Sequence, residues 1–164
     1  MNKVYIGLGS NKGNRPYNLK RAIDMIEELE LVQINYKSDI YKTRPMYNKN
    51  QKNFLNMVLE LNTSIKPLLL LKLLKKIESR LGRKLLEERN QEREIDIDIL
   101  DYDNIVLNNK ELILPHPYIL ERVFVLKPWS DIAPDFKLPN IDENIFQLLM
   151  KLNIDLSIIK KYNK

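Results

Sequence analysis

The sequence predicts an α+β fold in which a mainly antiparallel sheet is flanked by helices, the ferredoxin-like α/β sandwich being one option. Helical and strand patterns are interspersed along the chain, but several consecutive strands have no helix between them. This spacing excludes a purely doubly wound sheet. The chain has 164 residues, no internal repeat and no low-complexity linker, so a single domain over residues 1–164 is expected.

The first half of the chain alternates between the two patterns. Residues 3–8 form a short apolar run typical of a buried strand, and Pro16 then suits the first turn of a helix whose apolar spacing continues to Leu29. Residues 32–40 alternate apolar and polar side chains, which predicts a strand. Residues 43–53 are polar and aperiodic, and we expect a loop longer than the ~4–6 residues typical of compact domains.

The second half opens with the strand 54–61, whose alternation places Phe54 and Asn56 together on one face, opposite an aliphatic face. The apolar stripe of residues 67–81 predicts the strongest helix, with Gly82 as its C-terminal cap. Further elements are expected in this order: a charged loop at 83–93, a strand at 94–100, extended pieces at 105–107 and 112–114, a partly helical stretch at 118–129 and a helix at 143–152.

Composition excludes several classes of protein. The chain has no cysteine and a single histidine, His116, which rules out a disulfide scaffold, a thiolate zinc site, a cysteine nucleophile and a multi-histidine metal site. No apolar run approaches the ~18 residues of a membrane span, and the N-terminus lacks a signal pattern, so we expect a cytoplasmic protein with no membrane partner. The net charge of +5 is compatible with an anionic ligand.

The sharpest motif is R-E-I-D-I-D-I, in which Asp96 and Asp98 share one face of the predicted strand. Aspartate is a poor strand former and adjacent carboxylates repel, so a hard divalent cation is the natural partner. Arg83, Arg89 and Arg93 lie nearby in the sequence, and arginine suits bidentate phosphate contacts. Acids for magnesium beside arginines for phosphate predict a nucleoside triphosphate site. The alternative is an exposed strand with chance acids.

Two common phosphate-binding motifs are missing. The chain contains no G-x-x-x-x-G-K-[ST], and the Rossmann fingerprint fails because Lys12 stands where its third glycine would be. Gly7 and Gly9 instead let a backbone or a ligand approach closely, or they form a tight turn after the strand.

Several short motifs follow one another in a characteristic order along the chain. In sequence order these are Y-I-G-L-G-S-N at 5–11, Y-K-T-R-P at 41–45, F-L-N at 54–56, I-E at 77–78, G-R at 82–83, R-E-I-D-I-D-I at 93–99, P-H at 115–116, R-V-F at 122–124 and I-A-P at 132–134. This ordered set resembles the 6-hydroxymethyl-7,8-dihydropterin pyrophosphokinase family of folate biosynthesis. The G-L-G-S-N element together with R-x-x-D-x-D-[aliphatic] is specific. The resemblance runs through nearly the whole chain.

The resemblance implies a monomeric enzyme that moves the β,γ-diphosphate of ATP onto the pterin hydroxymethyl oxygen and releases AMP, with no nucleic-acid partner. By position, Asp96 and Asp98 would hold two Mg²⁺ ions and act in catalysis with Arg83 and Arg93. The implied ATP-binding residues are Lys75, Glu78, Arg83, Arg93, Ile99, His116 and Arg122. The implied pterin-binding residues are Gly9, Thr43, Pro45, Met46, Phe54, Asn56 and Phe124.

The residues agree with this chemistry, because diphosphate transfer needs positioning and charge neutralisation more than a nucleophile. Phe54 can stack on a flat ring while Asn56 meets its amide-like edge. Taken without the family, Phe54 is more simply a core residue and His116 a turn residue. The chain departs from the family pattern at Asn90–Gln91, at Met46–Tyr47 and at Leu85, all within the two loops expected to close over substrate.

Two other functions compete. In nucleotidyltransferases of the Gly-Ser then D-x-D type the two elements lie roughly a dozen residues apart in sequence, whereas Gly9 and Asp96 are far apart here. An RNA-binding module on a ferredoxin-like sheet would suit the net charge, but the aromatic RNP1 string is absent and the strand acids would repel phosphate. AMP formation from ATP that depends on the pterin, measured beside a salt titration of RNA binding, separates these alternatives.

Overall fold

The computed structural model describes residues 1–45, 50–83 and 91–163. The strands in these ranges are β1 (Asn2–Ser10), β2 (Val32–Lys37), β3 (Tyr41–Thr43), β4 (Phe54–Thr63), β5 (Asp96–Tyr102), β6 (Leu107–Asn108), β7 (Ile113–Leu114) and β8 (Lys160–Lys161). The α-helices are α1 (Arg15–Glu27), α2 (Pro67–Arg80), α3 (Val123–Ile132) and α4 (Ile145–Lys151), and the 3-10 turns are η1 (Ile119–Glu121) and η2 (Leu156–Ile158).

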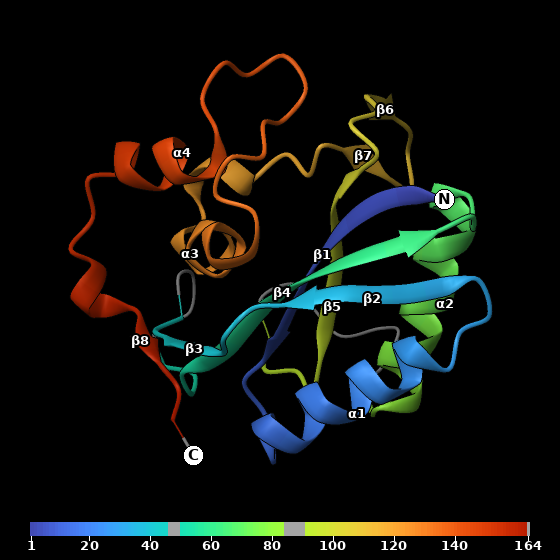
Figure 1. Cartoon of the computed structure of the whole chain (residues 1–164). Helices are drawn as coiled ribbons and strands as arrows, with labels where there is room; N and C mark the ends of the chain where they lie inside the picture. Colours follow the sequence, from blue (N-terminus) through green and yellow to red (C-terminus); the bar gives the residue numbers. More distant parts are fainter. Residues whose placement is uncertain (46–49, 84–90, 164) are drawn as a thin grey trace.

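The main sheet is antiparallel and runs in the order β5-β1-β4-β3-β8, with β2 also paired to β4. Helix α1 connects β1 to β2, and α2 connects β4 to β5 (Figure 1). The order β5-β1-β4-β2 with these two helices is the ferredoxin-like arrangement, so the predicted fold class is confirmed. Strands β6 and β7 form a separate two-stranded ribbon.

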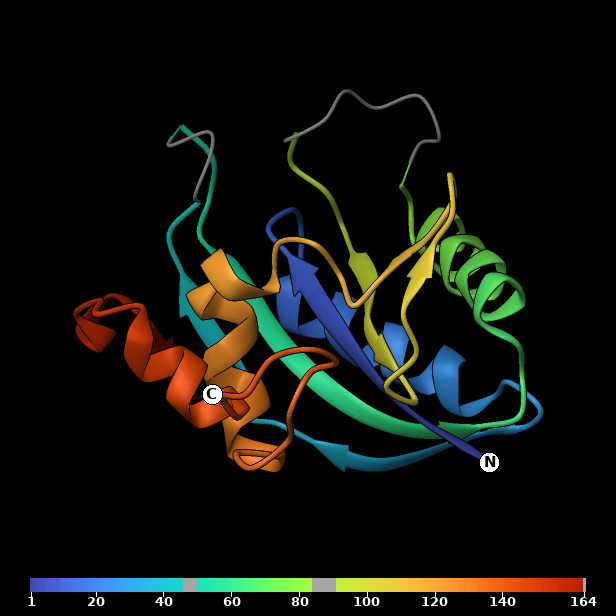
Figure 2. The same cartoon turned by 90° about the horizontal axis from the view of Figure 1, so that it is seen from above.

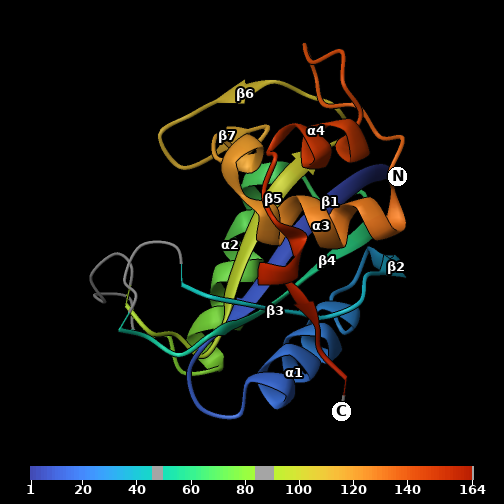
Figure 3. The same cartoon turned by 90° about the vertical axis from the view of Figure 1, so that its left-hand side faces the viewer.

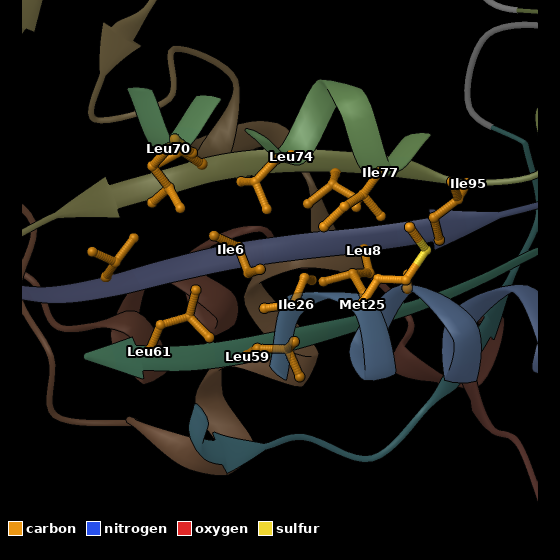
Figure 4. Close-up of a cluster of buried hydrophobic side chains, with 14 of the residues drawn as sticks. Ile6, Leu8, Met25, Ile26, Leu59, Leu61, Leu70, Leu74, Ile77 and Ile95 are labelled. Atoms are coloured by element: carbon orange, nitrogen blue, oxygen red, sulfur yellow. The ribbon is translucent and has the colours of Figure 1, made fainter. Parts of the chain in front are cut away.

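Each face of the sheet is covered by a pair of helices, which makes three layers (Figures 1 and 2). On one face, α1 and α2 pack on the aliphatic side chains of β1, β4 and β5, with Ile26, Leu59 and Leu74 at the centre (Figure 4). On the other face, α3 and α4 pack over Tyr5 of β1 and Val58 of β4, and Trp129 of α3 is fully buried in this cluster. The face of β4 and β5 that carries Asn56, Asp96 and Asp98 is the one that faces α3.

Local sequence signals explain where the helices begin and end. The Asn14 side chain accepts a hydrogen bond from the Tyr17 backbone N–H at 3.2 Å and caps α1. Gly82 follows α2 with φ +109°, the left-handed conformation that favours glycine, so the predicted C-terminal cap is confirmed. The start of α4 is closed by a capping box between Asn144 and Gln147.

Several predicted bounds were wrong. The expected strand 32–40 is two strands, because Ser38 leaves the ladder: its N–H donates to Val58 O and its hydroxyl accepts from Val58 N–H, both at 2.9 Å. Strand β3 precedes the expected loop 43–53 and overlaps it only at Thr43. Strand β5 spans Asp96–Tyr102 rather than 94–100, and β8 was not predicted. None of the described helices is long and apolar enough to cross a membrane.

Candidate active site

The sheet register brings the two specific motifs of the sequence side by side. Gly9 on β1 lies opposite Asn56 on β4 and opposite Asp96 on β5, and Gly7 lies opposite Asp98. Because directly paired residues share a face, the amide of Asn56 and both carboxylates look out on the same side, over a strip of glycine backbone. Residues that are far apart in the sequence therefore form one row.

Gly9 keeps that row open. A Cβ atom built on Gly9 would lie 2.9 Å from Asn56 Oδ1 and 3.8 Å from Phe54 Cδ1, so a side chain there would collide with the amide oxygen. The same construction at Gly7 meets only the Leu100 side chain, at 3.5 Å. Gly9 lies within β1 rather than in a tight turn, and the atom that comes closest to it is the side-chain amide oxygen of Asn56.

A cavity of about 160 Å³ lies above this strip. Predicted residues that line it are Gly9, Thr43, Pro45, Phe54, Asn56, Arg93, Asp96, Asp98, Arg122 and Phe124. Predicted Met46 lies outside the described residues, as do Leu85, Arg89, Asn90 and Tyr47. The structure therefore gathers the described pterin-site predictions and the carboxylate pair around one hollow.

The Asp96 carboxylate is held between two arginines. Arg83 Nη1 lies 2.5 Å from Asp96 Oδ1, and Arg93 Nη1 lies 2.8 Å from Oδ2. Burial alone would raise the pKa of Asp96, but the charges of Arg93, Lys75 and Arg83 outweigh it and lower the pKa. From the sequence motif we expected a metal ion to offset the charge of Asp96. In the structure, the guanidinium groups of Arg83 and Arg93 offset this charge.

Asp98 has a looser set of cations. Lys75 Nζ and His116 Nε2 each lie 3.9 Å from a carboxylate oxygen, and Arg122 Nη1 lies 3.8 Å away. Burial and the neighbouring Asp96 charge raise the pKa of Asp98. His116 Nδ1 accepts from the Tyr118 backbone N–H at 3.2 Å, so the proton of a neutral ring is on Nε2, which faces Asp98. Burial lowers the pKa of this histidine.

Glu78 lies under these residues, with 2% of its side chain exposed. Its carboxylate accepts hydrogen bonds from Ile97 N–H at 2.6 Å, Lys75 Nζ at 2.7 Å and Arg83 Nη1 at 2.5 Å. Burial raises the pKa of Glu78 despite these donors, Lys75 being the strongest opposing charge. Helix α2 thereby connects the β5 backbone to two of the cations.

The G-L-G-S-N motif ends in Asn11, a buried residue that fixes Arg93. The Arg93 backbone N–H donates to Asn11 Oδ1 at 2.9 Å, and the Asn11 backbone N–H donates to Arg93 O at 3.2 Å. The Asn11 amide also donates to Gln51 Oε1 at 3.1 Å. Asn11 was not predicted as a site residue, although its place in the motif was the available signal.

The opposite end of the cavity is aromatic and amide in character. Asn56 Nδ2 donates to Thr43 Oγ1 at 2.7 Å, which leaves Asn56 Oδ1 over Gly9. Phe54 and Phe124 both line the cavity, and Arg122 Cζ lies 5.6 Å from the centre of the Phe124 ring. Arg122 Nε is buried and has no hydrogen-bond partner among the described residues.

Some predicted residues are placed apart from the cavity, and others were missed. The Ile99 side chain packs in the core under α2, on the opposite face of β5, so only its backbone is near the carboxylates. Lys75, Glu78, Arg83 and His116 surround Asp96 and Asp98 without lining the cavity itself. Lining residues that the sequence did not indicate are Leu8, Arg44, Gln51, Met57, Leu100 and Val125.

The donor set suits a hard cation that is shared with a phosphate ligand. In the ranges 1–45, 50–83 and 91–163, no group of three or more His, Cys, Asp or Glu side chains could hold a metal ion. Asp96 and Asp98 supply two carboxylates, 26% and 34% exposed. One or two carboxylates completed by phosphate oxygens and water is the coordination that Mg²⁺ prefers.

Comparison with known proteins gives a consistent result. The family model for 7,8-dihydro-6-hydroxymethylpterin-pyrophosphokinase (HPPK) matches residues 5–134. The chain is similar to 2-amino-4-hydroxy-6-hydroxymethyldihydropteridine pyrophosphokinase from Bacillus subtilis, with 40% identity over 80% of this chain and 78% of that protein. The corresponding protein of Aquifex aeolicus is 44% identical over 82% of each chain.

Longer proteins also match. The folic acid synthesis protein FOL1 of Dictyostelium discoideum is 39% identical over 93% of this chain. Our chain spans only 22% of that relative and 18% of the fol1 protein of Pneumocystis carinii. Among solved structures, HPPK-DHPS of Plasmodium falciparum with pteroate has a TM-score of 0.77 over 98% of this chain and 45% of that one. Its sequence identity of 18% supports the fold alone.

Proposed function

Because the chain belongs to the 7,8-dihydro-6-hydroxymethylpterin-pyrophosphokinase family, we propose that it transfers the β,γ-diphosphate of ATP to 6-hydroxymethyl-7,8-dihydropterin. The pterin hydroxymethyl oxygen forms a bond to the β-phosphorus, the bond from that phosphorus to the α-phosphate oxygen breaks, and AMP leaves. The hydroxyl proton is lost to solvent or to a neighbouring base. The product is the pterin diphosphate, and the reaction is a step of folate biosynthesis.

The observation that carries this proposal is the row Asn56–Gly9–Asp96 across three strands. At one end of this row the Asn56 amide lies near the aromatic side chains that line the cavity. At the other end are the carboxylates of Asp96 and Asp98 with their arginines. A flat ring with a donor–acceptor edge fits the first end, with Phe54 and Phe124 at its faces. The hydroxymethyl group of such a ring would then point along the glycine strip toward the carboxylates.

Arg83 and Arg93 have two successive tasks in this proposal. Both are paired with Asp96, which holds their guanidinium groups at the site. When a triphosphate is present, phosphate oxygens replace Asp96 as the acceptors of these N–H groups, and the guanidinium charges offset the phosphate charge. Arg122, whose Nε has no partner in the described part of the chain, supplies a further donor on the nucleotide side. His116 supplies another through the Nε2 proton that faces Asp98.

Asp96 and Asp98 would hold Mg²⁺, two ions in the family's chemistry, which neutralises the triphosphate charge when bound. Glu78 takes a different part from the ATP contact that the resemblance implies. Its carboxylate is buried and already accepts from three donors, so it positions Lys75 and Arg83 rather than touching the nucleotide. The Ile99 side chain is buried on the opposite face of β5, so its contact with the nucleotide is through the backbone.

The competing functions have less support. An RNA-binding sheet offers an open face for bases, whereas helices cover both faces of this sheet in the described part of the chain (Figure 2). A Gly-Ser then D-x-D nucleotidyltransferase would also pair a glycine strip with carboxylates, as Gly9 and Asp96 do here. The family match and the amide end of the cavity favour the pterin enzyme.

One experiment tests the proposal directly. The purified chain is incubated with ATP, Mg²⁺ and 6-hydroxymethyl-7,8-dihydropterin, and the products are identified by chromatography and mass spectrometry. We expect AMP and pterin diphosphate in equal amounts, and no AMP when the pterin is left out. Formation of ADP with a pterin monophosphate, or of AMP at the same rate without pterin, would refute the assignment. Size-exclusion chromatography of the same sample tests the expected monomer.

A further inference from the structure

The C-terminal segment adds a strand to the sheet beside the proposed pterin pocket. Strand β8 pairs with β3 in the register Tyr41 to Lys161 and Lys42 to Lys160. Figures 1 and 3 show this segment returning along the edge of β3 after α4. We call residues 156–162 the strap. The strap lies beyond residues 5–134, the part matched by the family model.

The strap is fastened at three points. The Ile159 side chain is buried and packs in the same cluster as Tyr41 and Trp129. The Tyr162 backbone N–H donates to Ile40 O at 2.7 Å, just before β3 begins. Lys161 Nζ also lies 2.6 Å from Asp39 Oδ2, although this pair is about half exposed and contributes little.

Strand β3 needs such support because it has only three residues. Its other edge pairs with β4 at the residues of the pocket: Tyr41 is opposite Asn56, and Thr43 is opposite Phe54. The Thr43 hydroxyl accepts the 2.7 Å hydrogen bond from Asn56, and Arg44 and Pro45, which follow β3, line the cavity. A short strand held on a single edge is among the first elements to open locally.

We propose that the strap is a positioning segment for pterin binding. By closing the outer edge of β3, it holds the Thr43 hydroxyl against Asn56 and so fixes the orientation of the amide that meets the pterin edge. Thr43 is buried, and none of the residues that line the cavity in the described part of the chain belongs to the strap. Its effect is therefore preorganisation of the pocket, not contact with the substrate. This inference rests on the proposed function.

The test compares two substitutions at one position. Tyr162→Pro removes the backbone N–H that bonds Ile40 O, whereas Tyr162→Ala removes the same side chain but keeps the N–H. A third variant, a chain ending at Asp155, removes the whole strap. Pterin affinity is measured by calorimetry in the presence of a non-hydrolysable ATP analogue, and the affinity for the analogue is measured alone. Hydrogen exchange reports on the β3 amides without any substrate.

We expect Tyr162→Pro to weaken pterin binding by about fivefold relative to Tyr162→Ala, the worth of one hydrogen bond, and to raise KM for the pterin more than it lowers kcat. The truncated chain should lose at least as much pterin affinity. Affinity for the ATP analogue should change less than twofold, and the β3 amides should exchange faster. A merely structural role would instead lower the melting temperature and weaken both ligands alike.

Unchanged pterin affinity in Tyr162→Pro, or equal loss of both affinities, would overturn the proposal. If the truncated chain does not fold, the paired substitutions decide alone. Failure of the proposed function looks different, because the wild-type chain would then make no AMP from ATP and pterin. Protection of the β3 amides would still report whether the strap holds that strand.

Discussion

The Glu78 carboxylate accepts a hydrogen bond from Arg83 Nη1 at 2.5 Å, and the same Nη1 lies 2.5 Å from Asp96 Oδ1. One guanidinium nitrogen thus connects a buried acid of α2 to a carboxylate of the cavity. The side chain of Glu78 is 2% exposed, whereas that of Asp96 is 26% exposed. The buried acid is therefore the fixed end of this connection, and Asp96 is the end that a ligand can replace.

Glu78→Gln should lower turnover by about tenfold or more while leaving the fold intact. Burial raises the pKa of Glu78, so loss of its charge costs little stability, and the amide oxygen can still accept from Ile97 N–H. Lys75 and Arg83 lose their fixed anion and become less well placed. Steady-state kinetics and thermal melting check this, with the exposed Glu111→Gln as the control. A large drop in melting temperature with normal turnover would contradict it.

Asp96→Asn and Asp98→Asn should each nearly abolish turnover at saturating Mg²⁺, because both carboxylates face the proposed triphosphate. Their melting temperatures without ligand should differ. Nearby cations lower the pKa of Asp96, so its charge stabilises the fold above that pKa, whereas burial raises the pKa of Asp98, whose charge is unfavourable at neutral pH. Asp98→Asn should therefore melt at the higher temperature. Turnover at the wild-type rate in either variant would contradict the proposed catalytic role of that carboxylate.

Arg83→Ala and Arg93→Ala should slow turnover by on the order of 10²-fold and weaken binding of an ATP analogue much less. Both guanidinium groups are engaged by Asp96, so their contacts with phosphate replace existing ion pairs and add little net binding energy. Arg80→Ala, an exposed arginine at the end of α2, is the matched control. Equal losses of affinity and turnover would argue against this division.

The sequence predicted the layers of this fold because amphipathic periodicity is a local property. The stripe of α2 and the alternation of β4 follow from which side chains must be buried, and Gly82 marks the helix end by its backbone conformation. Short edge strands carry no such signal. Strands β3 and β8 have three and two residues, and their pairing depends on Ile159 reaching a core built from distant elements.

The site was predictable in composition but not in connectivity. The D-x-D pattern indicated two carboxylates on one face, and like-charge repulsion indicated that something must offset them. Which cations would do so depended on α2 packing against β5, which brings Arg83 to Asp96 and Lys75 near Asp98. Glu78 was predicted by resemblance, but its burial under the cations depends on tertiary packing. Asn11 contacts Arg93 only because the ends of β1 and β5 are adjacent.

Gly9→Ala should weaken pterin binding by about tenfold or more, because the new Cβ would lie 2.9 Å from Asn56 Oδ1 and displace the amide. Gly7 lines the same cavity, but the Cβ atom of Gly7→Ala would meet only the flexible Leu100 side chain at 3.5 Å. This substitution should therefore be tolerated. Asn56→Ala should match the loss of Gly9→Ala, and nucleotide affinity should stay within twofold in all three. Calorimetric titration of pterin measures this, and equal effects at Gly7 and Gly9 would be inconsistent with the proposed amide contact.

Asp101 is a buried carboxyl outside the cavity that lies across from Tyr5 on β1. Its Oδ2 accepts from the Asn104 N–H at 3.2 Å, but Oδ1 has no partner among the described residues. Burial raises the pKa of Asp101 to about 6. The folded protein therefore binds this proton more tightly than the unfolded chain, and stability is lost as the pH rises through the interval from about 4 to 6.

Asp101→Asn removes that titration, so the variant should gain stability over the wild type as the pH rises from 4 to 7.5. The shift from 3.8 to about 6 limits the gain to roughly 3 kcal/mol. Urea unfolding of both proteins across this range measures the difference, which cancels the other titrating groups. Asp142→Asn is the control, since this aspartate is exposed and lies far along the chain from Asp101. A difference between wild type and Asp101→Asn that stays constant with pH would show that the buried carboxyl does not titrate here.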